Sequence, residues 1–267
     1  MLRRDRWIVL ASLAAITILA WLYLAWLNAV PSLMPMPEAP AAMEMSGMDM
    51  GAMAVAPASP PPTWSTTGVA LLFAMWAVMM IGMMTPSIAP MILLYARVAR
   101  SAEAQRKPFA SSVWFMAGYV LAWTLFAVLA TAGHLALDAA RMLTPMMAAA
   151  SPPVGAALLI LAGVYQWTPL KDVCLAQCQS PLQFIQRHGG FRGDPGGAIR
   201  LGLRHGLYCI GCCWPLMLLL FLGGVMNLLW IAALAAVVLS EKVLPFGRLF
   251  ARIAGAMMIA AALALLF

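Results

Sequence analysis

Charged side chains are scarce in this sequence. Asp, Glu, Lys and Arg make up 9% of the 267 residues, whereas 64% are hydrophobic and the mean hydropathy is +0.91. A soluble domain of this length cannot bury so much apolar surface, so a lipid bilayer must act as the solvent for most of the chain. The composition therefore predicts an all-α integral membrane protein, a polytopic helical bundle.

Motifs for ATP-driven movement and for hydrolysis are also absent. The sequence has no GxxxxGK[ST] phosphate-binding loop, no DKTG-like phosphorylation motif and no soluble ATPase domain. These absences exclude movement driven directly by ATP for this chain alone. No Ser-His-Asp set and no paired carboxylates indicate hydrolysis, so we expect a protein that is not an enzyme.

Acidic residues are fewer than basic ones, 9 against 16, which leaves a net charge of +7. A positive charge can indicate a nucleic-acid partner, but here the basic residues flank apolar segments and form no patch interleaved with aromatics. We interpret them as markers of membrane topology. The expected partner is the lipid bilayer, with no nucleic acid.

The apolar segments predict about seven transmembrane helices, an N-terminal extra helix followed by a six-helix core. With the N-terminus inside, Arg141 is the only one of the sixteen Lys and Arg residues on the outer side, as the positive-inside rule requires. We expect a multi-pass protein of the bacterial inner (plasma) membrane. The predicted spans are residues 7–27, 68–97, 109–132, 150–167, 206–222, 225–240 and 249–267.

Composition also divides the chain into three parts. Residues 1–30 are predicted to be an N-terminal transmembrane anchor, because the apolar run is long for a signal peptide and lacks its small-x-small cleavage pattern. Residues 31–66 are rich in Met and Pro and lack bulky side chains, so we predict a disordered periplasmic loop. Residues 67–267 contain the six-helix membrane domain.

Methionine is frequent in the predicted outer loop. A plain linker is the simplest interpretation, but a linker has no need of methionine, whereas thioethers bind Cu(I) without deprotonation. We predict that this loop captures metal through a weaker set of ligands. These are Met43, Met45, Met48, Met50 and Met53.

The second predicted span is also rich in methionine, and we expect its helix to be broken at Thr85-Pro86 and again at Pro90. A broken helix is tolerated at membrane depth where it lines a cavity or is buried in protein. Methionine is a common packing residue, so packing and a methionine-lined path for metal remain equal alternatives. The residues concerned are Met79, Met80, Met83 and Met84.

The fifth predicted span contains three of the five cysteines, all within a stretch of five residues. On a helix, His205, Cys209, Cys213 and Met217 recur every fourth residue and share one face, and Cys212 lies beside Cys209. An imidazole, three thiols and a thioether suit a soft metal such as Cu(I). Packing of buried thiols and thiol redox chemistry are the alternatives.

Pro215 affects the same helix. It cannot donate a backbone hydrogen bond, so we expect the carbonyl of Gly211 to lose its helical partner and the helix to kink beside the cysteines.

The other two cysteines, Cys174 and Cys178, lie in a long inner loop over residues 168–204. Their CxxxC spacing places both thiols on one helical face and differs from the CxxC of thioredoxin-type centres. They complete the site of the fifth span or form a separate transfer site. All five cysteines lie in the membrane or on its reducing inner side, so structural disulfides are not expected.

Three polar residues receive structural interpretations. We expect Asn227 to cap a helix or pair across helices, rather than bind metal. Glu241 is expected to pair with Lys242 or Arg248 at the inner surface. His134 is interpreted as an ordinary interfacial histidine of an outer connection.

Four sequence blocks resemble DUF2182, a family described as predicted metal-binding integral membrane proteins and sometimes labelled copper chaperones. The blocks are residues 79–87, 165–181, 202–217 and 224–227, followed by Glu241-Lys242. The resemblance covers about residues 68–265 and leaves out the first span and the methionine-rich loop. It implies a metal-binding membrane protein, with copper as the metal.

Together, these observations predict a membrane protein that binds Cu(I) and acts in copper delivery, transport or homeostasis. Its expected partners are a periplasmic copper protein or a membrane copper enzyme. One alternative is a membrane thiol-disulfide oxidoreductase, which would be the enzymatic case. The other is a non-catalytic assembly factor for a copper or haem enzyme.

Overall fold

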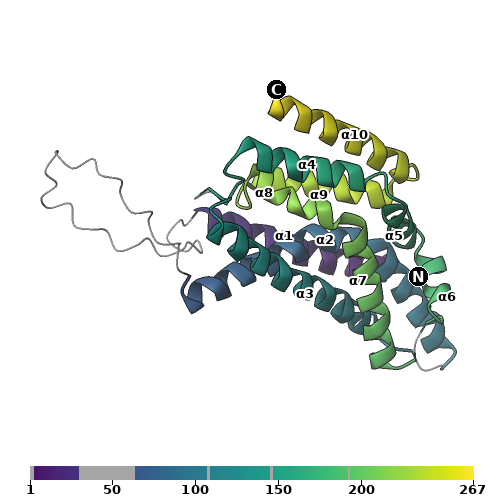
Figure 1. Cartoon of the computed structure of the whole chain (residues 1–267). Helices are drawn as coiled ribbons and strands as arrows, with labels where there is room; N and C mark the ends of the chain where they lie inside the picture. The colour runs from purple at the N-terminus through teal and green to yellow at the C-terminus, as the bar shows by residue number, and fades with distance from the viewer. Residues whose placement is uncertain (1–2, 30–63, 107–108, 145–146, 192) are drawn as a thin grey trace, which may run out of the picture.

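The computed structural model describes residues 3–29, 64–106, 109–144, 147–191 and 193–267. Within these ranges every regular element is a helix, apart from one isolated bridge between Leu143 and Ala149. The predicted all-α fold is confirmed (Figure 1). The helices are α1 (Arg3–Ala29), α2 (Thr66–Ala104), α3 (Ser112–Ala139), α4 (Pro152–Tyr165), α5 (Pro169–Gln179), α6 (Pro181–Arg187), α7 (Pro195–Leu218), α8 (Leu220–Gly223), α9 (Leu228–Val243) and α10 (Gly247–Leu266).

Five of the described helices are long and apolar enough to cross a membrane: α1, α2, α3, α7 with α8, and α10. Helices α4 and α5 pass the same test together, as a pair bent by 67°, which makes up to six. The remaining predicted span corresponds to α9, which has 16 residues. At 1.5 Å per residue it is about 24 Å long, shorter than the roughly 30 Å of a bilayer core.

Helix α2 is continuous over 39 residues, so the predicted breaks at Pro86 and Pro90 are wrong. Hydroxyl groups support the backbone around the prolines. Thr85 Oγ1 donates to the Ile81 carbonyl (2.6 Å), and Ser87 Oγ donates to the Met84 carbonyl (2.8 Å). Membrane helices tolerate proline where Ser and Thr side chains and neighbouring helices support the backbone, as they do here.

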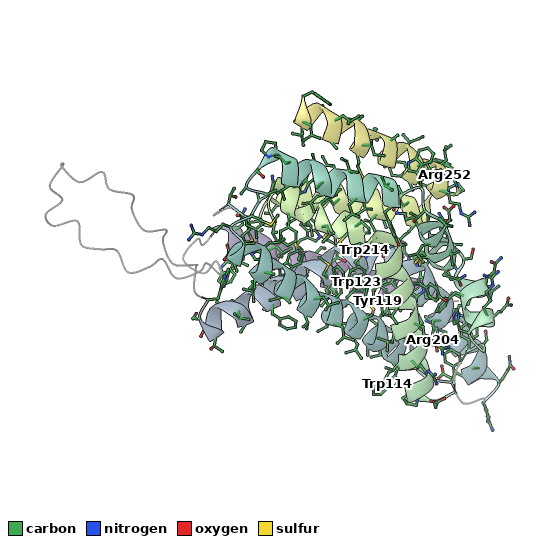
Figure 2. All side chains as sticks on the ribbon, in the orientation of Figure 1. Trp114, Tyr119, Trp123, Arg204, Trp214 and Arg252 are labelled. Carbon is green, nitrogen blue, oxygen red and sulfur yellow. The ribbon has the colours of Figure 1, made fainter. Side chains whose placement is uncertain are left out.

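Helices α3 and α7 cross at very short range because glycines face the contact. A Cβ atom added to Gly202 would lie 1.9 Å from the Phe115 carbonyl oxygen, and one added to Gly118 would lie 2.0 Å from that of Ile199. Small residues allow this close approach of membrane helices. Figure 2 labels Tyr119 and Trp123 on α3 beside α7, and this crossing positions α7 for the site described below.

Helix α7 begins at Pro195, well before the predicted start of the fifth span at residue 206. The Asp194 side chain caps it by accepting from the Gly197 N–H (2.6 Å). The predicted inner loop over residues 168–204 contains helices α5 and α6 as well as these first turns of α7. Helix α5 packs against both α7 and α9.

The other helices complete the bundle. Helix α1 packs against α2, where Ala20 and Trp21 cover Gly82. Helix α10 packs against α4, on the far side of α9 from α1 and α2 (Figure 1). Figure 1 shows the start of α1 at the same end of the bundle as α5 and α6, the end predicted to lie inside. The predicted metal-capturing methionines, Met43 to Met53, lie outside the described residues.

Candidate metal centre

The two groups of cysteines meet in the folded chain. Cys209, Cys212 and Cys213 are buried on α7, and α5 packs against this helix. The Cys178 Sγ lies 4.0 Å from the Cys212 Sγ. All of these cysteines are free thiols. The structure thus brings Cys178 of α5 to the thiols of α7, and whether the cysteines of the two helices share one metal site stays a prediction.

Backbone contacts hold these thiols in place. The thiols of Cys212 and Cys213 both donate to the Cys209 carbonyl, at 3.1 and 3.0 Å. Cys174 lies against the backbone of Gly211, where an added Cβ would be 2.8 Å from its Sγ. We call Cys178, Cys209, Cys212 and Cys213 the thiol cluster, with Cys174 at its edge.

Two side chains from other helices contact Cys209, and a third contacts one of these two. Lys242 of α9 donates from its Nζ to the Cys209 Sγ at 2.8 Å, and the same Nζ lies 3.8 Å from the Met84 Sδ of α2. The Tyr119 hydroxyl of α3 lies 3.1 Å from the Cys209 Sγ. The thiol cluster is thus enclosed by α2, α3, α5, α7 and α9, and it holds a cationic side chain among its sulfur atoms.

A buried ion pair lies beside this cluster, and it corrects the prediction for Glu241. The carboxylate pairs with Lys171 of α5 at 2.6 Å, with 1% of each side chain exposed, instead of with Lys242 or Arg248 at the surface. Gln166 donates to the other carboxylate oxygen at 2.9 Å. A surface position was predicted because a charged pair at the end of an apolar run usually faces water. The packing of α5 on α9 buries this one.

The carbonyl that Pro215 frees has a new partner. The Tyr165 hydroxyl of α4 donates to the Gly211 carbonyl, which the proline deprives of its helical donor. A side chain from a neighbouring helix thus replaces the backbone donor that Gly211 was predicted to lose. This bond ties α4 to the segment of α7 that carries the cysteines.

His205 and Met217 are on the predicted face of α7, but the structure surrounds them mainly with hydrophobic groups. The His205 ring is 3% exposed and packs against the rings of Phe115, Tyr119 and Phe184. Met217 is buried and lines an apolar hollow about one helical turn beyond Cys213. Among the described residues neither forms a hydrogen bond with a cysteine sulfur, so their role as ligands stays a prediction.

The methionines of α2 are all buried, from 0 to 3% exposed. Those that the sequence suggests as a path for metal are Met79, Met80, Met83 and Met84. Met84 alone of these four has a contact with the site, through Lys242. The structure joins one end of the predicted methionine path to the thiol cluster and leaves the choice between packing and a path open for the others.

His134 is a corrected interpretation and Asn227 a confirmed one. His134 is 1% exposed and lies within α3, between the rings of Trp64, Trp76 and Phe221, and not in a connection between helices. The helix α3 continues past the predicted end of the third span, which buries the ring. Asn227 caps α9 by accepting from the Trp230 N–H (3.2 Å), as predicted.

The donor set of the thiol cluster fits a soft, low-coordinate ion. A metal–thiolate bond of about 2.3 Å allows two sulfurs that share an ion to lie at most about 4.6 Å apart. The Cys178 and Cys212 sulfurs, at 4.0 Å, are within this limit. No three His, Cys, Asp or Glu side chains of the described ranges are arranged to hold a metal together. The geometry therefore provides a pair of thiols, with a thioether nearby, rather than a cage of hard ligands.

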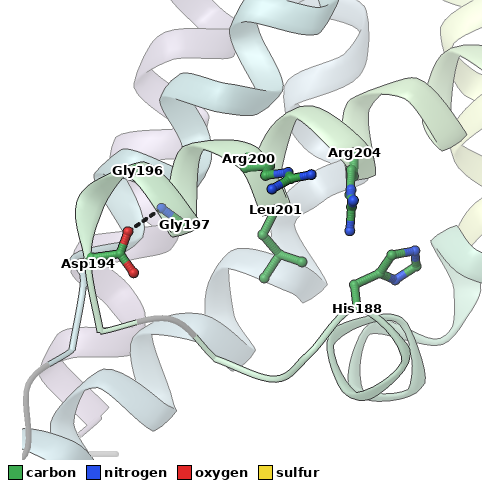
Figure 3. A pocket seen from close by; sticks show the side chains of 7 residues that line it. All are labelled: His188, Asp194, Gly196, Gly197, Arg200, Leu201 and Arg204. Carbon is green, nitrogen blue, oxygen red and sulfur yellow. Dashed lines mark hydrogen bonds between the residues drawn. The ribbon is translucent and has the colours of Figure 1, made fainter.

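Two hollows lie along the first half of α7, and one of them is lined by Cys174. One, of about 580 Å³, is lined by Cys174, His188, Arg204, Leu207 and Tyr208. The second, of about 440 Å³, shares His188 and Arg204 with it and also contains Arg200 (Figure 3). Cys174, at the edge of the thiol cluster, thus borders a space that is also lined by His188 and Arg204.

Sequence reasoning missed Lys242, Tyr119 and Lys171 as parts of the site. Lys242 carried a signal, because Glu241-Lys242 ends an apolar run and stands in a block of the family resemblance. A charged side chain within a membrane segment is a candidate functional residue by itself. Tyr119 carried no such signal, because aromatic residues are common in membrane helices.

Comparison with known proteins places the chain in a family. No curated protein and no solved structure matches it. One family model matches residues 73–265, a range that contains the whole thiol cluster together with Lys171, Glu241 and Lys242. The copper-related role expected from the resemblance is thereby confirmed at the level of the family. The chain belongs to the PpoB2 family, described as a copper chaperone.

Proposed function

We propose that the protein binds Cu(I) at the thiol cluster within the membrane and passes it on, as a step of copper delivery, transport or homeostasis. The observation that carries the proposal is the contact of Cys178 of α5 with Cys212, which is buried on α7 together with Cys209 and Cys213. Soft thiolate and thioether ligands select Cu(I) over hard cations. Copper is here the cargo of the protein.

The surroundings of the cluster support a direction for the cargo. The proposed order begins with capture by Met43 to Met53 outside a bacterial inner membrane and continues along the α2 methionines. Met84 is the last of these methionines, because Lys242 connects it to the thiols. Cys174, at the edge of the cluster, then borders the hollow along the first half of α7, where a thiol can hand the ion to an acceptor. A copper protein or membrane copper enzyme would be the partner.

Metal content of the full chain tests this proposal. The protein is purified in detergent without oxygen, incubated with Cu(I), separated from unbound ion and analysed for copper. We expect close to one copper ion per chain, and less than a tenth of this in Cys212→Ser and in the triple variant Cys209→Ser/Cys212→Ser/Cys213→Ser. Full loading of the triple variant, or no loading of the unchanged protein, would contradict the proposal.

Cys174→Ser is the matched control, since its sulfur lies at the edge of the cluster. We expect it to retain bound Cu(I) and to release the ion more slowly to an added thiol chelator. An equal release rate would remove Cys174 from the proposed exit path. A loss of copper as large as in Cys212→Ser would instead make Cys174 a ligand.

The Cys178–Cys212 contact also supports the second candidate, a thiol-disulfide oxidoreductase. Cysteines three or four residues apart on a helix have Cβ atoms about 5–6 Å apart, whereas a disulfide requires about 3.5–4.5 Å. The pairs within α5 or within α7 are therefore poorly placed, and Cys178–Cys212 is the pair that could close across helices. Alkylation with a thiol mass tag after mild oxidation tests it. A reversible Cys178–Cys212 disulfide in a protein that takes up no copper would favour the oxidoreductase.

A further inference from the structure

Lys242 is a buried cation placed among sulfur atoms. The residue is 6% exposed, and its Nζ is 2.8 Å from the Cys209 Sγ and 3.8 Å from the Met84 Sδ. A buried charged group is costly unless it is paired and hydrogen-bonded. We therefore looked for a partner that compensates the charge of Lys242 and for a function of this charge.

No carboxylate supplies that partner among the described residues. The ion pairs found there join Lys171 to Glu241 and Arg252 to Asp172. Glu241 is adjacent to Lys242 in sequence, but its two oxygens accept from Lys171 and Gln166. The Lys171–Glu241 pair is neutral as a unit, so Lys242 contributes one uncompensated positive charge to the thiol cluster.

This positive charge changes which metal ion the cluster can accept. Two thiolates and one ammonium carry a net charge of −1, which a monovalent ion such as Cu(I) or Ag(I) neutralises. A divalent ion such as Zn²⁺ or Cd²⁺ leaves the buried site with a net charge of +1. Two thiolates is the appropriate count, because the described residues bring no three ligating side chains together.

We infer that Lys242 is a specificity-determining residue that makes the cluster select monovalent soft ions over divalent ones. Thiolates alone do not make this choice, since they bind Zn²⁺ as well as Cu(I). Where Cys209 is one of the two thiolates, the metal lies about 2.3 Å from its sulfur, and the ammonium, 2.8 Å from the same sulfur, is at most about 5 Å from the metal. At an effective dielectric constant of about 20, repulsion of one further unit charge at that distance weakens binding roughly a hundred-fold. This inference rests on the proposed copper function.

The experiment compares Cu(I) and Cd²⁺ binding by the full chain in detergent without oxygen, for the unchanged protein, Lys242→Met and Lys242→Arg. Cd²⁺ is followed by its thiolate-to-metal absorption, and both affinities are measured by competition with chelators. We expect Lys242→Met to raise the affinity for Cd²⁺ relative to Cu(I) roughly a hundred-fold. Lys242→Arg retains the charge and should change this ratio by less than about tenfold.

The outcomes separate this inference from the proposed function. Absence of Cu(I) binding in the unchanged protein refutes the copper function and the inference with it. Cu(I) binding together with an unchanged ratio in Lys242→Met refutes the role of Lys242 alone. The unchanged protein provides a test that needs no variant: Cd²⁺ bound at the thiol cluster as tightly as Cu(I) would also overturn the inference.

Discussion

The buried Lys171–Glu241 pair leads to a prediction about stability. Lys171→Met removes one partner of an ion pair that is 2.6 Å long and whose side chains are 1% exposed. The Glu241 carboxylate then keeps only its bond from Gln166. Breaking a buried pair in this way leaves an uncompensated charge, so we expect a loss of roughly 3–5 kcal/mol in the free energy of unfolding. For a protein of this size the loss corresponds to a decrease in Tm on the order of 10 °C.

The assay is thermal and denaturant unfolding of the detergent-purified protein, followed by circular dichroism. Lys171→Met/Glu241→Gln makes both positions neutral and retains an oxygen that accepts from Gln166. Because replacement of a whole buried pair is often close to neutral, we expect the double variant to lose less than about 2 kcal/mol. The control is Arg252→Met, which breaks the partly exposed pair with Asp172 (3.2 Å). Exposed pairs contribute roughly 0–1 kcal/mol, and little change is expected.

Two results would refute this reasoning. One is a free energy of unfolding of Lys171→Met within about 1 kcal/mol of that of the unchanged protein, since a buried unpaired carboxylate should destabilise the fold by more than this. The other is a double variant that loses as much as the single variant. The latter result would mean that the packing of the lysine stem between α5 and α9, and not its charge, stabilises the contact.

Three further predictions concern the helices that position the site. Gly202→Ala places a Cβ 1.9 Å from a backbone oxygen of α3, so we expect it to cost at least about 3 kcal/mol in unfolding experiments. Gly133→Ala, where nothing lies within 4 Å, should instead stabilise by up to about 1 kcal/mol, and equal effects of the two would contradict the close α3–α7 contact. Tyr165→Phe leaves the Gly211 carbonyl unpaired and should lower the free energy of unfolding by about 1–3 kcal/mol. The loss should be clearly smaller in a Pro215→Ala background, where a backbone amide again donates to that carbonyl. An equal loss in both backgrounds would show that the tyrosine bond does not compensate for the proline. Asn227→Ala removes the cap of α9 and should cost about 0.5–2 kcal/mol by the same measurement, whereas Asn227→Asp should be nearly neutral; a large loss in both would point to a role other than capping.

Features that depend on local chemistry could be predicted from the sequence. Low charge and high hydropathy determine that helices form and that lipid surrounds them. Helical periodicity alone places Cys209, Cys212 and Cys213 together. The missing amide of Pro215 identifies the Gly211 carbonyl as unpaired before any fold is known. The spacing around Asn227 predicts its cap, because capping involves only neighbouring residues.

Contacts between helices were decided by the tertiary structure. The approach of α5 to α7 brings Cys178 to Cys212, and α9 carries Lys242 to Cys209. The same packing pairs Glu241 with Lys171, although Lys242 is the sequence neighbour of Glu241. Periodicity shows which side chains share a face of a helix, but the partner of that face depends on which helices can approach closely. At Gly118 and Gly202 the absence of a side chain allows the close approach of α3 and α7. Which helix packs against these glycines is seen only in the folded chain.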